Sequence, residues 1–106
     1  MADALARLAG PQALTGVAAT IYTTPAATTA VVRAVHVVNE TTTSAAFTLS
    51  VGVDGAGKRF FYAQQVAPGD SFDWSGNLVL AAGDVLQAYA SAPAALTITI
   101  SGVTSA

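Results

Sequence analysis

The sequence lacks cysteine and has few charged residues. No Cys occurs among its 106 residues, and Asp, Glu, Lys and Arg together make up only 9%. Disulfides, thiolate metal sites and cysteine nucleophiles are therefore excluded. An ordinary soluble domain carries roughly 25% charged residues, so small neutral residues, above all 24 alanines and 13 threonines, must cover this surface. Because charge repulsion protects such a surface poorly, another protein buries it easily.

Basic blocks and long apolar runs are also missing. The four basic residues, Arg7, Arg33, Lys58 and Arg59, are scattered, and the net charge is −2. A nucleic-acid binder needs several phosphate contacts from one basic face, so we expect no nucleic-acid partner. The apolar runs are far shorter than the roughly 20 residues of a membrane span. No signal peptide is evident at the N-terminus, so we expect no membrane partner and synthesis in the cytoplasm.

From Gly16 onward the sequence is a series of short β-strand patterns separated by Gly and Pro turns. The strands that we expect cover residues 17–23, 28–39, 45–53, 58–66, 71–74, 78–80, 85–92 and 96–100. A chain of this length has room for one domain with one hydrophobic core. Regularly spaced strands of this kind predict an all-β fold, a single antiparallel β-sandwich, jelly-roll-like, with about 7–8 strands.

The first 16 residues differ from the rest. Residues 2–9 are good helix formers, and Gly10-Pro11 is a helix stop signal. We therefore predict a short N-terminal arm or helix over residues 1–16, followed by the sandwich domain over residues 17–106. Two helical turns are marginal alone in water, so the segment is either a frayed terminus or an arm that orders on docking to a neighbouring subunit. The candidate interface residues on one side of this helix are Met1, Leu5 and Leu8.

One motif imitates a phosphate-binding loop. Residues 52–58 match the pattern G-x-x-x-x-G-K. A genuine loop of this kind continues with Ser or Thr, which binds magnesium, and with a helix whose N-terminus faces the phosphate. This chain continues with Arg59 and a strand pattern, so we interpret the motif as a hairpin turn.

No catalytic or metal site is evident. His36 is the single histidine and shares its predicted strand face with Val32, Ala34 and Val38, so we expect it in or beside the core, with a contact between subunits as the functional alternative. Most of the six carboxylates are turn residues, and no stretch has the dense oxygen ligands of a calcium loop. We therefore predict that the protein is not an enzyme and has no cofactor or metal.

The aromatic residues gather in two short segments. Phe60, Tyr62, Phe72 and Trp74 are placed to form a cross-strand cluster. Core packing is the simpler interpretation. The alternative is an exposed platform for a ligand or carbohydrate, centred on Tyr62 and Trp74.

Several motifs, taken in order, resemble those of a known group of proteins. Residues 21–39 contain Tyr22-x-x-Pro25-Ala26 followed by a long strand with Val31-Val32-Arg33 that ends in Asn39. Residues 73–76 (DWSG) and 80–88 (LAAGDVLQA) continue the pattern, which covers roughly residues 17–103. This succession resembles small virion proteins of tailed bacteriophages.

The resemblance implies a β-sandwich component of the particle, either a minor tail or fibre-associated protein or a decoration protein on the capsid. It supplies no catalytic residues. We expect a virion protein, made in the host cytoplasm, whose partners are itself, as a ring or trimer, and other virion proteins. The alternative is a receptor- or glycan-binding module of a tail fibre.

Overall fold

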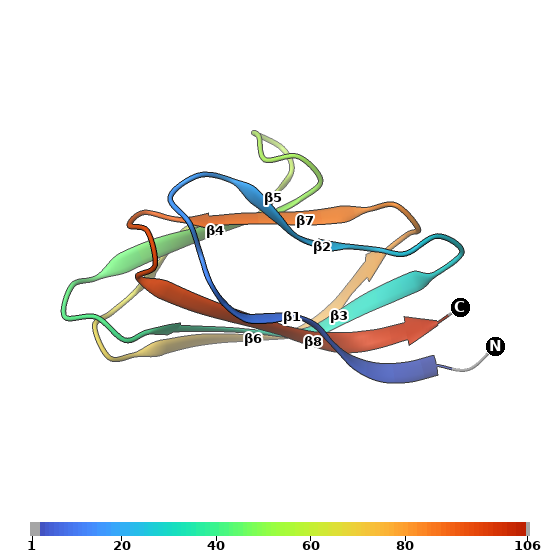
Figure 1. Cartoon of the computed structure of the whole chain (residues 1–106), viewed down its shortest axis with the longest axis horizontal. Coiled ribbons are helices and arrows are strands. Elements are labelled where there is room, and N and C mark those ends of the chain that lie inside the picture. The colour runs from blue at the N-terminus through green and yellow to red at the C-terminus, as the bar shows by residue number, and fades with distance from the viewer. Residues whose placement is uncertain (1–2, 106) are drawn as a thin grey trace.

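The chain folds into eight β-strands. The computed structural model describes residues 3–105, and within them no helix is present that is long and apolar enough to cross a membrane. The strands are β1 (Asp3–Ala13), β2 (Ala19–Thr23), β3 (Thr29–Asn39), β4 (Ala45–Val51), β5 (Arg59–Val66), β6 (Ser71–Leu80), β7 (Val85–Ala90) and β8 (Leu96–Ser105) (Figure 1). All the pairings between them are antiparallel.

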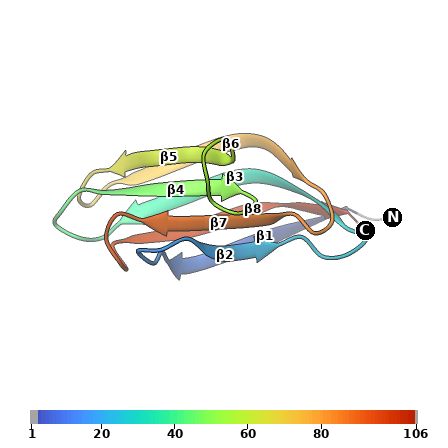
Figure 2. The same ribbon diagram turned by 90° about the horizontal axis from the view of Figure 1, so that it is seen from above.

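The strands form two sheets that stack face to face, as Figure 2 shows from above. One sheet has the order β1-β8-β3-β6 and the other β2-β7-β4-β5. The first strand therefore pairs with the last, β2 with β7, β3 with β6, and β4 with β5, so that the chain is one long hairpin rolled into a sandwich. This nested order is that of a jelly roll. It confirms the predicted all-β, jelly-roll-like fold.

The core fills the space between the two sheets. It exists because alternate residues of each strand point inward, and in this sequence those residues are apolar. Its largest fully buried apolar side chains are Phe47, Leu14, Leu49, Leu80, Leu86, Leu96, Ile98, Ile100, Val32, Val35 and Val37. The strongly predicted strands 28–39 and 96–100 thus supply the centre of one sheet.

The predicted break between residues 74 and 78 is absent, and β6 is one continuous strand. Gly76 has a packing role here and does not end the strand. A Cβ atom at this position would lie 2.7 Å from Cζ2 of Trp74. The glycine therefore leaves room for the indole ring against the strand.

The helix predicted near the N-terminus is wrong, because residues 3–13 form strand β1 along the edge of β8. Helix propensity is a weak preference, and pairing with a neighbouring strand overrides it. Ala6 lies opposite Gly102 of β8, where a Cβ would fall 2.0 Å from the carbonyl oxygen of Val31. The three strands β1, β8 and β3 thus pack closely at this point. The division of the chain at residues 16 and 17 stays a prediction.

Replacing Gly102 tests this close packing. We expect Gly102→Ala to destabilise the fold by about 2 kcal/mol or more, because the new methyl group overlaps backbone that cannot move without breaking the β3–β8 pairing. The urea midpoint, followed by circular dichroism, measures the loss. Ser101→Ala, at the exposed neighbouring position, should stay within about 0.5 kcal/mol of the unaltered chain. Equal midpoints for the two variants would contradict this packing.

Candidate interaction surfaces

The outer face of the β1-β8-β3-β6 sheet carries a line of apolar residues that crosses all four strands. Leu5 of β1 lies opposite Val103 of β8, Val103 opposite Val31 of β3, and Val31 opposite Val79 of β6. We call these four residues the apolar row. Leu5 is 90% exposed and Val79 63%. Because side chains directly opposite one another on one face lie about 5 Å apart, the row is a continuous hydrophobic strip facing solvent.

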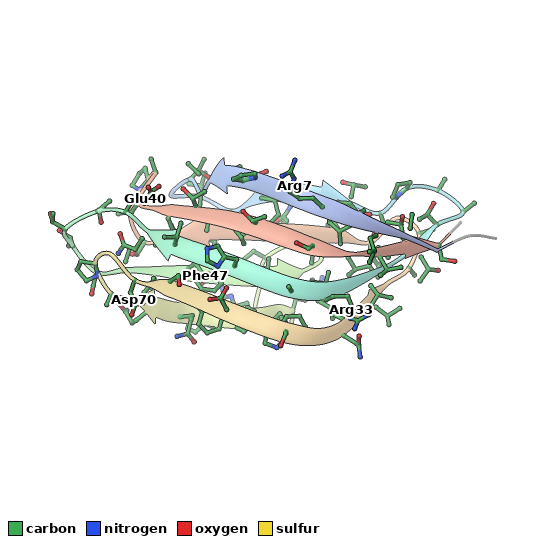
Figure 3. All side chains as sticks on the ribbon, turned by 90° about the horizontal axis from the view of Figure 1, so that it is seen from below. Arg7, Arg33, Glu40, Phe47 and Asp70 are labelled. Atoms are coloured by element: carbon green, nitrogen blue, oxygen red, sulfur yellow. The ribbon has the colours of Figure 1, made fainter. Side chains whose placement is uncertain are left out.

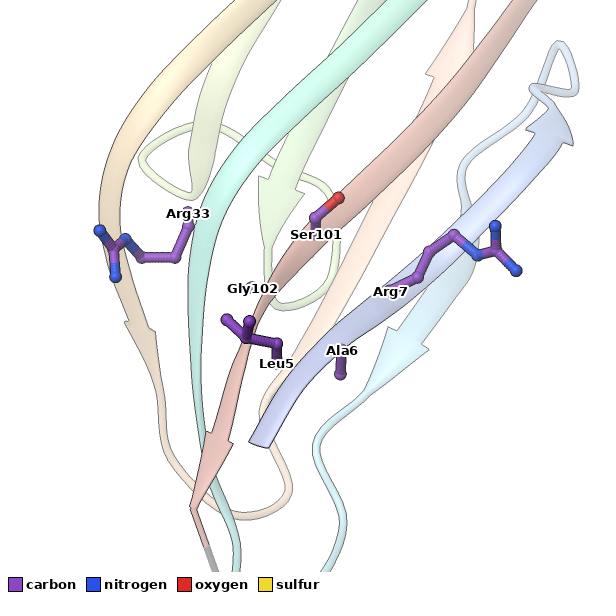
Figure 4. A pocket seen from close by; sticks show the side chains of 6 residues that line it. All are labelled: Leu5, Ala6, Arg7, Arg33, Ser101 and Gly102. Carbon is purple, nitrogen blue, oxygen red and sulfur yellow. The ribbon is translucent and has the colours of Figure 1, made fainter. Parts of the chain in front are cut away.

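Two arginines flank the apolar row. They border a shallow hollow at its β1 end, lined by Leu5, Ala6, Arg7, Arg33, Ser101 and Gly102 (Figure 4). Arg7 extends away from Leu5 and from β8, whereas Arg33 extends over β6. Among the side chains that the structure describes, residues 4–105, neither arginine has an ion-pair partner. The outer face therefore offers two unpaired positive charges beside an exposed apolar strip.

The acidic loop residues Glu40 and Asp70 lie at one end of the molecule. Figure 3 shows both beyond the ends of the strands, with Arg33 toward the opposite end of the same sheet. Asp84 follows β6 at the other end of that strand, so acidic residues lie at both ends of the molecule.

His36 lies on the outer face and not in or beside the core, so the core prediction is wrong. The pairing of β3 with both neighbours shifts by one residue between Val32 and Ala34, and this bulge turns His36 outward although Val32 points inward. The imidazole Nδ1 lies 2.5 Å from Oδ1 of Asp73, with side chains 47% and 68% exposed. A role for His36 in a contact between subunits stays a prediction.

The His36–Asp73 pair lacks the other parts of a catalytic site. A triad needs a nucleophile within hydrogen-bond reach of the second imidazole nitrogen. Among the hydrogen bonds of residues 3–105, His36 has Asp73 as its partner and no hydroxyl. The same residues contain no group of three His, Asp or Glu side chains that would hold a metal ion. The arrangement is an exposed hydrogen-bonded pair on the outer face.

The opposite sheet is covered by the loop over residues 52–58, which contains the phosphate-loop-like motif. This loop is a turn that folds back over β4, closed by the Lys58 amide donating to the Gly55 carbonyl at 3.1 Å. Ser50 donates to Oδ1 of Asp54 at 2.7 Å, and the Asp54 amide donates to Gln87 at 3.1 Å. The loop thereby buries the outward-facing Ser50 of β4, and the motif has a structural role.

Arg59 completes this polar network. Its Nε and Nη2 atoms donate to Oδ1 and Oδ2 of Asp54 at 3.1 and 3.3 Å. The hydrogen bonds from Arg59 and then from Ser50 hold the pKa of the Asp54 carboxyl below its usual range. The guanidinium also lies over the Tyr62 ring, 4.6 Å from its centroid. Asp54 therefore ties the loop to both β4 and β5.

The aromatic residues close the sandwich at the β5–β6 edge. Strands β5 and β6 belong to different sheets, so the predicted cluster joins two sheets instead of adjacent strands. The ring pairs link Phe47, Phe60, Phe61, Phe72 and Trp74, with centroids 4.9 to 6.2 Å apart. Tyr62 is 65% exposed, and no ring contact joins it to Trp74 within residues 3–105. A ligand platform at Tyr62 and Trp74 stays a prediction.

Two of the three N-terminal candidates, Leu5 and Leu8, do not share a face. Met1 lies outside the described residues. Leu5 faces solvent, whereas Leu8 is half-buried and packs against the core. A common side was expected because a helix was predicted. In the observed strand, the bulge after Arg7 directs Leu5 and Leu8 differently. Sequence reasoning missed Val31, Val79 and Val103, because only the pairing register aligns them with Leu5.

Comparison with known proteins gives structural neighbours only. No family model matches the chain. No curated protein matches it. In a solved structure of the infectious bursal disease virus Gx strain, one chain is 10% identical with a TM-score of 0.60, and the match covers 97% of this chain and 32% of that one. A chain of the Gt strain structure is 11% identical with a TM-score of 0.47, over 96% of this chain and 31% of that one.

The Gx strain match shows a shared fold. This chain spans about a third of the length of that viral chain, so the likeness concerns only that part of it. Infectious bursal disease virus is an animal virus. The likeness therefore adds nothing specific to bacteriophages, and a family is not assigned.

Removing the Trp74 ring tests its packing role. We expect Trp74→Ala to destabilise the fold by about 3 kcal/mol, because the ring packs against Phe60 and Phe61 at the open edge of the core. Chemical denaturation measures the effect. The matched change Tyr62→Ala removes an exposed ring and should cost less than about 1 kcal/mol. If Trp74→Ala left stability unchanged, the packing interpretation would fail.

The Asp54 network predicts a pH dependence of stability. A carboxyl whose pKa is lowered on folding stabilises the fold above its unfolded value, near 3.9, and loses this contribution as the pH falls through the folded pKa. Asp54→Asn should therefore lower the denaturation midpoint at pH 7, and the gap to the unaltered chain should close below about pH 4. Lys58→Gln, an exposed change in the same loop, should keep the pH dependence. A gap that is equally wide at pH 7 and pH 3 would contradict this assignment.

Proposed function

We propose that this protein is a non-enzymatic structural subunit of a virus particle, displayed on the particle surface. We further propose a tailed bacteriophage as the virus, with the subunit decorating the capsid or belonging to the tail. The jelly-roll fold shared with a viral chain supports a virion role. The ordered motifs between residues 17 and 103, which resemble small phage virion proteins, support the bacteriophage assignment.

The observation that carries the proposal is the exposed apolar row. A sheet face that lies against water in the working protein is usually polar. This face instead shows Leu5 and Val79 to solvent, with Val31 and Val103 between them. With only 9% charged residues in the chain, charge repulsion does little to keep copies apart. Burial against other subunits removes the row from water.

The proposed partners are copies of the chain and other virion proteins. A ring or trimer is the assembly that we expect, since closed symmetry buries an exposed apolar face without forming open fibres. The subunit would be made in the host cytoplasm and then incorporated into the particle. Among the described residues, the His36–Asp73 pair is exposed and has no nucleophile hydrogen-bonded to it. This supports a role without catalysis.

One observation favours a second candidate. Tyr62 is 65% exposed and has the Arg59 guanidinium against its ring, so an aromatic ring and a charged donor group lie side by side at the surface. A receptor- or glycan-binding module of a tail fibre would bind immobilised glycans as the isolated protein. Loss of that binding in Tyr62→Ala, with folding intact, would support this candidate.

Disruption of the apolar row tests the leading proposal. We expect the protein in solution to be larger than a monomer by light scattering, and Val79→Lys to shift the mass toward the monomer because a charge then interrupts the apolar strip. Val17→Lys is the matched control, since Val17 is 72% exposed but lies outside the row, and it should not change the mass. A stable monomer across the accessible concentration range would count against an assembly subunit.

A further inference from the structure

Strand β1 presents one unpaired edge. Its other edge pairs with β8, and it is the terminal strand of its sheet. Within residues 3–105, no backbone hydrogen bond from another segment covers this edge over residues 3–8. Unpaired N–H and C=O groups along an edge strand are a template for another strand unless charges, bulges or prolines block it. On β1 the bulges and the proline begin only after Arg7, and the two charges within residues 3–7 have opposite signs.

Residues 3–7 form the regular part of this edge. They pair with β8 in unbroken register, from Asp3 opposite Ser105 to Arg7 opposite Ser101. Beyond Arg7 the register shifts twice, and Pro11 has no amide hydrogen to donate. An added strand therefore has five regular residues to pair with. Leu5 is the middle residue of these five.

The sequence of this segment is complementary to itself. It reads Asp3-Ala4-Leu5-Ala6-Arg7, with an acidic residue two positions before Leu5 and a basic residue two positions after it. If two copies run antiparallel and Leu5 meets Leu5, residue 3 of each copy lies opposite residue 7 of the other. An acidic and a basic position of the sequence are then in register twice, since a two-fold contact repeats every pair.

We propose that two copies of this chain pair antiparallel along their β1 edges, about a two-fold axis at Leu5, and so join their outer sheets into one continuous sheet. The proposal rests on the proposed function in that copies of the chain contact one another in the particle. It adds the edge, the register and the residues of one contact.

This pairing explains the exposure of Leu5. At 90% exposed, Leu5 is an unusual residue to find on a regular strand of a folded domain. In the pair it packs against the partner subunit's Leu5, and the two apolar rows become one strip across both subunits. Arg7 extends away from β8 and so toward the added strand (Figure 4). The alanines at positions 4 and 6 offer no bulk that would keep the two strands apart.

A charge-swap experiment tests the register. Arg7→Asp places acid opposite acid, and Asp3→Arg places base opposite base, so each change alone should weaken self-association at least about tenfold in sedimentation velocity. The double variant Asp3→Arg/Arg7→Asp restores both opposite-charge pairs and should recover most of the affinity. Lys58→Asp is the matched control, because it reverses a positive charge in the exposed loop over the other sheet. Circular dichroism confirms that each variant folds.

The outcomes separate this inference from the proposed function. Weakening in the two single variants with recovery in the double variant supports the β1 pairing. Association that is unaffected by the single variants, or that the double variant fails to recover, overturns the β1 register but leaves the assembly function standing. A discrete dimer that forms nothing larger and has the charge-swap behaviour supports the β1 pairing but counts against the proposed ring or trimer. An unaltered protein that stays monomeric at every concentration overturns both.

Discussion

The pairing of β3 with β8 is the constraint on which the rest of the structure depends. It runs from Thr29 opposite Ser105 to Asn39 opposite Leu96 and joins the two halves of the chain at the centre of one sheet. Because side chains alternate along each strand, this register decides which residues fill the core and which face solvent. It places Val35 and Ile100 inside, and it aligns Val31 with Val103 outside. The apolar row is thus a consequence of the same pairing that builds the core.

The two outer faces of the sandwich differ in how far the chain itself covers them. On the β2-β7-β4-β5 sheet, the loop over residues 52–58 covers Ser50 of β4, and Asp54 holds it there. On the β1-β8-β3-β6 sheet, none of the described residues covers the apolar row, and two arginines beside it have no ionic partner. The chain therefore covers part of one outer face with its own loop and leaves the apolar row of the other exposed.

Most of the sandwich was predictable because its strands carry local signals. Strands β3 and β8 are rich in β-branched residues, and Pro25 and Pro93 lie shortly before them in the chain. Strand β1 was not predictable in this way, since its alanines and leucines favour a helix and only pairing with β8 makes it a strand. The outward turn of His36 depends on a bulge after Val32, which leaves no trace in the hydrophobic pattern. The aromatic residues were recognised, but the sequence does not show that Phe61 joins the cluster while Tyr62 faces solvent.

The central claim is that association covers the outer face of the β1-β8-β3-β6 sheet. Hydroxyl-radical footprinting tests it most directly, because side-chain oxidation reports solvent access one residue at a time. As the protein concentration is raised through the association range, oxidation of Leu5 and Val79 should fall, while that of Tyr62, on the other sheet, should stay constant. Unchanged oxidation of Leu5 and Val79 in the associated state, or protection of Tyr62 in their place, would contradict the claim.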